Sequence, residues 1–145
     1  MTDDTFVHAD WVFGTDPRFI TRPGVLRDLA ARFPSITFVG AHMGGLAADF
    51  DELARDLPPA ENLYLDTSNA AHILSADQFV QLLRRHGARR IIFGTDWPWF
   101  AHGEEIPKIL DLLERAGFDN TAVRAVMRTN AERLLFPPGQ FPNDE

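Results

Sequence analysis

The chain has 145 residues, a formal net charge of -7 and no cysteine. Its length suits one ordinary domain, its hydrophobic content of 45% can supply a core, and the lack of cysteine excludes disulfides and thiolate chemistry. The negative charge repels nucleic acid and anionic membranes, so we expect neither as a partner. No apolar run approaches the ~20 residues of a membrane helix and no signal-peptide pattern is present, so we expect a cytoplasmic protein.

Short apolar runs alternate with segments of helical periodicity along the chain. The runs are rich in β-branched and aromatic residues, and they predict four strands, at residues 5–11, 36–43, 63–69 and 89–97. Apolar residues at helical spacing predict a helix after each strand and one further helix, at residues 25–33, 50–57, 75–86, 106–113 and about 120–135.

Proline and glycine separate these elements: Pro58 and Pro59 follow the second helix, and Gly87 follows the third. Strands that alternate with helices imply βαβ units and a parallel sheet that is buried on both faces. We therefore predict an α/β fold of four consecutive βα units in one domain, residues 1–136, and a flexible tail at residues 137–145.

The third predicted helix carries two local signals. Ser75 with Gln78 three residues later resembles a capping box at its start. A basic cluster lies at its end and in the loop that follows, formed by Arg84, Arg85, Arg89 and Arg90. Positive charge there suits a helix C-terminus and a surface loop. A phosphate site is the alternative interpretation.

Polar residues close each of the four predicted strands. His8 closes the first strand and His42 the second, Asp66 with Ser68 follows the third, and Asp96 follows the fourth. Ligands bind beyond the carboxyl ends of parallel strands, so these side chains are expected at one rim. Two imidazoles and a carboxylate are a ligand set that suits a divalent metal.

Each of these residues also has a structural interpretation. A single histidine at a strand end is commonly a hydrogen-bonded core residue, and Asp96 can cap a helix or form a turn. The tryptophans Trp11, Trp97 and Trp99 can belong to the core. We interpret the three remaining histidines as structural or exposed: His72, His86 and His102. The repeated placement at strand ends is what favours a site.

Five segments together resemble the amidohydrolase-related family that includes aminocarboxymuconate-semialdehyde decarboxylase and resorcylate decarboxylase. In chain order they are "FVHAD", "RFPSITFVGAHMGG", "NLYLDTSN", "IIFGTDWPW" and "VMRTNAERLL". The resemblance implies that the four βα units correspond to strands five to eight of a metal-dependent (β/α)8 barrel, that is, a half barrel with its closing helix.

The resemblance also implies roles for individual residues. His8 and Asp96 match metal ligands, and His42 with Asp96 matches the catalytic residues that act on the metal-bound water or the substrate. The implied cofactor is a divalent metal, commonly zinc, with manganese or iron also compatible. The implied reaction is hydrolysis or non-oxidative decarboxylation of a small carbonyl or carboxylated substrate. Trp11, Trp97 and Trp99 are expected to bind that substrate.

The sequence departs from the family pattern in two respects. The family has an H-x-H metal pair at the end of its first strand, and this sequence contains no H-x-H. A closed barrel also needs eight units rather than four. Three explanations stay open: the chain lacks an N-terminal half, two copies close one barrel as a homo-oligomer, or the chain is a non-catalytic half barrel that binds a partner chain.

Overall fold

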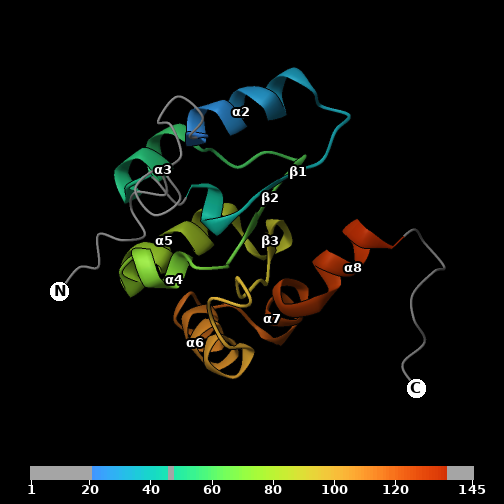
Figure 1. Ribbon diagram of the computed structural model, residues 1–145. Helices are drawn as coiled ribbons and strands as arrows, with labels where there is room; N and C mark the ends of the chain where they lie inside the picture. The colour runs from blue at the N-terminus through green and yellow to red at the C-terminus, as the bar shows by residue number, and fades with distance from the viewer. Residues whose placement is uncertain (1–20, 46–47, 137–145) are drawn as a thin grey trace.

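The computed structural model describes residues 21–45 and 48–136. Its centre is a parallel sheet of three strands in the order β1-β2-β3 (Figure 1). The strands are β1 (Phe38–Gly40), β2 (Leu63–Asp66) and β3 (Ile91–Ile92). Phe38 is in register with Leu63, and Leu65 is in register with Ile91. Successive strands therefore lie side by side and run in the same direction, as the alternating pattern predicts.

Helices connect the strands and follow the last one (Figure 1). The α-helices are α2 (Pro23–Arg32), α3 (Phe50–Asp56), α4 (Ala70–Ile73), α5 (Ala76–His86), α6 (His102–Arg115), α7 (Asn120–Arg124) and α8 (Asn130–Leu135). Shorter turns are the 3-10 helices η2 (His42–Gly44) and η3 (Ala88–Arg90) and the π-helical turn η4 (Ala125–Thr129). Helix α2 packs against α3, and α5 packs against α6. Within the described ranges, no helix is both long and apolar enough to cross a membrane.

Three of the four predicted strands are present, and each is shorter than predicted. The backbone leaves the extended conformation early after β1, because His42 and Met43 adopt left-handed φ angles of 56° and 55°. After β3, the N–H of Phe93 donates to the carbonyl of Val126 at 2.9 Å instead of continuing a strand ladder. The predicted strand at 5–11 and the tail lie outside the described residues, so the four-unit half barrel stays a prediction.

The hydrophobic core lies between the sheet and its helices. Leu63 and Leu65 alternate along β2 and are buried, and Phe79 and Leu83 of α5 and Leu113 of α6 are buried with them. Burying a side chain of this size contributes roughly 1.5–3 kcal/mol. The predicted capping box at the start of α5 is also confirmed, since its serine and glutamine side chains exchange hydrogen bonds with the backbone.

Two asparagine side chains join elements that are distant in the sequence. The amide nitrogen of Asn62 lies 2.9–3.1 Å from three carbonyl oxygens, at and beyond the end of α2 and just before β1. Asn130 is buried and donates to the carbonyls of Ala88 and Ile91, at 2.7 Å each. These bonds give partners to backbone carbonyls at or near the ends of helices and strands, and they fix α2 and α8 relative to the sheet.

His86, the last residue of α5, is a buried histidine. Burial, with a smaller contribution from the charge of Arg85, lowers the pKa of His86 from 6.5 to about 4. Its Nε2 is buried and has no hydrogen-bond partner among the described residues. The ring is therefore neutral at neutral pH. Protonation is unfavourable because the charged ring would be shielded from water.

The buried state of His86 predicts a pH dependence of stability. Since the unfolded chain binds a proton at His86 below about pH 6.5 and the folded chain does not until about pH 4, stability falls as pH falls through this window. The free energy of unfolding, measured with urea, should fall between pH 7 and about pH 4.5 in both proteins. The fall should be roughly 2–3 kcal/mol larger for wild type than for His86→Gln. Equal losses in the two proteins would contradict this account.

Candidate active site

The carboxyl ends of the three strands bring several predicted site residues to one edge of the sheet. His42 begins η2 just after β1, Asp66 is the last residue of β2, and Asp96 lies in the turn that follows β3. His42 contacts Asp66, and Asp96 contacts Asn69 from the turn after β2. The predicted residues His8 and Trp11 lie outside the described residues.

One oxygen of Asp66 links the ends of β1 and β2. Asp66 Oδ1 accepts hydrogen bonds from the N–H of His42 at 2.9 Å, from the N–H of Ser68 at 3.0 Å and from the Ser68 hydroxyl. The Oγ and the carbonyl oxygen of Ser68 each lie 3.0 Å from His42 Nδ1. Asp66 therefore holds the backbone of His42 directly and its ring through Ser68.

A second contact joins the ends of β2 and β3. The buried Asn69 donates from Nδ2 to Asp96 Oδ2 at 3.0 Å, and its own Oδ1 is buried without a partner among the described residues. Both residues have left-handed φ angles, 57° for Asn69 and 62° for Asp96. Asparagine and aspartate tolerate this conformation better than most residues, and such backbone clusters at functional sites. Asn69, in the "LDTSN" segment, was not among the predicted site residues.

Trp97 and Trp99 lie in the turn after Asp96 and are 66% and 62% exposed. The Trp97 ring lies 5.4 Å from the ring of His102, and His102 Nδ1 lies 2.9 Å from the hydroxyl of Thr95. The interpretation of these two tryptophans as core residues is therefore wrong. Their role in substrate binding stays a prediction.

A buried ion cluster that has no clear signal in the sequence supports this turn. The side chain of Glu105 is fully buried, accepts from Lys108 at 2.6 Å and lies 2.8 Å from His72 Nε2. Burial alone would raise the pKa of Glu105, but the hydrogen bonds from Lys108 and His72 outweigh it and hold that pKa below its usual value. The His72 ring stacks on Phe100 at 3.7 Å, which connects the cluster to the tryptophan turn.

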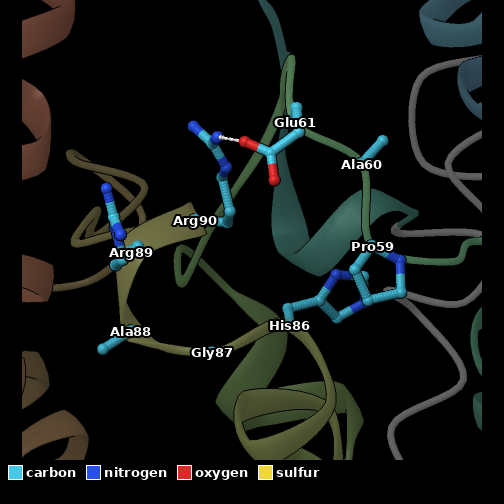
Figure 2. Close-up of a pocket in the computed structure, with 8 residues that line it drawn as sticks. All are labelled: Pro59, Ala60, Glu61, His86, Gly87, Ala88, Arg89 and Arg90. Carbon is cyan, nitrogen blue, oxygen red and sulfur yellow. Dashed lines mark hydrogen bonds and ion pairs between the residues drawn. The ribbon is translucent and has the colours of Figure 1, made fainter.

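A cavity of about 520 Å³ lies at the opposite, amino ends of β2 and β3 (Figure 2). Its lining is Pro59, Ala60, Glu61, His86, Gly87, Ala88, Arg89 and Arg90. Arg90 pairs with Glu61 and donates to the Tyr64 hydroxyl at 2.8 Å. Arg84 donates to two carbonyl groups at the end of α6, as expected for a basic residue near a helix C-terminus. Arg84 and Arg90 thus serve structural contacts.

The described residues do not form a metal site by themselves. Within residues 21–45 and 48–136, no three His, Asp or Glu side chains gather closely enough to hold an ion. Asp96 already accepts from Asn69, and Nδ1 of His42 is engaged by Ser68. The predicted ligand His8 lies outside this part of the chain.

Comparison with known proteins gives one family and a few solved structures. The family model described as "Amidohydrolase" matches residues 5–136. A Pseudomonas putida protein assigned provisionally as a 2-pyrone-4,6-dicarboxylic acid hydrolase is 20% identical, with a TM-score of 0.48, over 77% of this chain and 48% of that chain. A 2,6-dihydroxybenzoate decarboxylase from Rhizobium is 26% identical, with a TM-score of 0.47, over 73% of this chain and 36% of that chain. The chain thus spans about half, or less, of the length of these proteins, and no curated protein sequence matches it.

Because the backbone at Asn69 is left-handed, we expect glycine to be tolerated better than alanine at this position. Both Asn69→Gly and Asn69→Ala lose the bond to Asp96, but only alanine also strains the backbone, so Asn69→Ala should be less stable by about 1 kcal/mol. The matched control is the exposed Gln81 on α5, where Gln81→Ala should be more stable than Gln81→Gly by a similar amount. Urea unfolding measures all four. The same order at both positions would contradict the assigned turn.

Proposed function

The chain belongs to the amidohydrolase family, and on that premise we propose that it forms one half of a metal-dependent barrel enzyme. The proposed reaction is hydrolysis or non-oxidative decarboxylation of a small carbonyl or carboxylated compound. The observation that carries this proposal is the gathering of His42, Asp66 and Asp96 at the carboxyl edge of a parallel sheet. Enzymes with parallel α/β sheets bind their substrates at that edge.

In this proposal, His8 and Asp96 hold a divalent metal at the carboxyl edge. A neutral imidazole and a carboxylate suit zinc best, and manganese or iron can use the same pair. Such a metal, when bound, lowers the pKa of a coordinated water toward ~7. His42 and Asp96 are the proposed catalytic residues. His42 exchanges a proton at Nε2, which lies outside its hydrogen bonds with Ser68, and Asp96 orients the attacking water.

The proposed substrate-binding residues are Trp11, Trp97 and Trp99. The turn that follows Asp96 presents two large, exposed aromatic rings next to a strand end with polar side chains. Aromatic rings supply apolar contact area, while the few polar groups orient a ligand. A small carbonyl or carboxylated molecule with an apolar body fits this combination.

The open edges of the sheet support a second half for the barrel. In the part of the chain that the structure describes, β1 and β3 each pair with β2 alone. Unpaired edges are usually covered or paired, and a closed barrel removes them. We propose that a missing N-terminal half or a second copy of this chain completes the ring and supplies the histidines that an H-x-H pair would give.

The second candidate function is a non-catalytic half barrel that binds a partner chain. Five apolar side chains on α2 and around β1 favour it, because they are 36–49% exposed: Val25, Leu29, Phe33, Ile36 and Val39. An apolar surface of this kind is typical of a protein contact. This candidate needs no metal, so metal retention by the chain would favour the enzyme.

Metal retention tests the enzymatic proposal directly. The wild-type chain should retain zinc, manganese or iron in elemental analysis, and Asp96→Asn should lose most of it, because asparagine keeps the left-handed turn and removes the ligand charge. The matched control is Asp111→Asn on the exposed surface of α6, which should retain metal as the wild type does.

A folded wild-type chain without metal would instead leave two interpretations: the non-catalytic half barrel, or a fragment whose metal site needs its missing half. Full metal retention in folded Asp96→Asn would contradict the assigned ligand. Circular dichroism of each variant establishes that the fold is intact before its metal content is compared.

A further inference from the structure

We propose that Asp66 and Ser68 are positioning residues that hold His42 with its hydrogen on Nδ1, which leaves the lone pair of Nε2 available to the reacting atoms. The reaction that His42 would serve rests on the proposed function. The tautomer itself follows from hydrogen bonds among the three residues.

Only one arrangement of hydrogens satisfies the polar atoms of this group. The Ser68 hydroxyl has a single hydrogen, and its contact with the acceptor Asp66 Oδ1 uses it. Ser68 Oγ can then only accept from His42 Nδ1, at 3.0 Å. The Ser68 carbonyl oxygen, which is always an acceptor, lies 3.0 Å from the same nitrogen. Nδ1 must therefore carry the hydrogen and share it between the two oxygens.

The opposite tautomer fails on the same distances. If Nδ1 carried the lone pair, the Ser68 hydroxyl would have to donate to it, and Ser68 Oγ would face Asp66 Oδ1 with no hydrogen between them. The Ser68 carbonyl oxygen would also face that lone pair at 3.0 Å. Repulsion between unpaired acceptors therefore selects the Nδ1–H form.

Backbone contacts also hold His42, Asp66 and Ser68 in place. The N–H of His42 donates to Asp66 Oδ1 at 2.9 Å, which holds His42 in its left-handed conformation. Gly94, beyond β3, lies closely over the pair: a Cβ there would be 3.3 Å from Ser68 Cβ and 3.7 Å from Asp66 Cγ. Residues from the ends of all three strands thus border the group.

This tautomer determines the direction of the first proton transfer. A neutral His42 with hydrogen on Nδ1 begins as a proton acceptor, and the proton moves from the water or the substrate to Nε2. The resulting imidazolium keeps its Nδ1–H on Ser68, with the Asp66 carboxylate behind the hydroxyl. The same proton leaves from Nε2 later in the reaction, which restores the starting tautomer. Asp66 and Ser68 orient and stabilise the ring without exchanging a proton.

Nitrogen NMR of the full 145-residue chain, with 15N-labelled histidine, measures the tautomer at about pH 8.5, where ordinary imidazoles are neutral. The His42 signals are assigned by their loss in His42→Gln. We expect the Nδ1 shift of a protonated nitrogen and the Nε2 shift of an unprotonated one. In Ser68→Ala the two shifts should move toward each other, because one of the two acceptors is lost.

The matched control is Thr67→Val, which removes a buried hydroxyl whose hydrogen bonds are made with Gly94. It should leave both His42 shifts unchanged, whereas Ser68→Thr, which keeps a hydroxyl, should preserve the wild-type pattern. A protonated Nε2 in the wild type would overturn the proposal whichever variants fold. Unchanged shifts in folded Ser68→Ala would overturn the role of Ser68. Neither result bears on metal retention in Asp96→Asn, so the proposed function is tested separately.

Discussion

The positions of His42 and Ser68 in the candidate site depend on a single carboxylate oxygen, Asp66 Oδ1. Asp66 Oδ1 receives three hydrogen bonds, and two of their donors are backbone N–H groups at the ends of different strands. Hydrogen bonds to a charged acceptor are worth roughly 1.5–3 kcal/mol each, about twice those between neutral groups. Because β1 has only three residues, its ladder alone fixes the following turn weakly. Asp66 supplies the fixed point from which His42 and Ser68 take their positions.

The two ends of the sheet carry different kinds of residues. The carboxyl end carries the left-handed residues His42, Asn69 and Asp96 with their polar side chains, and two exposed tryptophan rings lie beside them. At the amino end, a cavity is lined by the Arg90–Glu61 pair and the neutral His86 (Figure 2). Barrel enzymes commonly place chemistry at the first end and stability at the second. The buried Glu105 cluster extends the support of the carboxyl end, since it joins α4 and α6 to the turn that carries the tryptophans.

The sequence predicts the elements better than the contacts between them. Apolar runs locate three strands, and helical spacing locates the helices that follow, because burial imposes these local periodicities. Strand ends were predicted too late, since the left-handed turns at His42 and Asn69 have no periodic signal. The bonds of Asn62 and Asn130 span 26 or more residues, so only the folded chain reveals them. His42, Asp66 and Asp96 were placed at strand ends from sequence, whereas the hydrogen bonds that organise them needed the structure.

Paramagnetic line broadening tests most directly whether these strand ends form one metal-binding edge. Manganese(II) added in small steps to the 15N-labelled chain broadens the amide signals of residues near the ion. The account predicts that signals of the three strand ends, around His42, Ser68 and Asp96, broaden first and together. Broadening that begins at exposed acidic residues of the helices, or that affects all signals equally, would contradict the account.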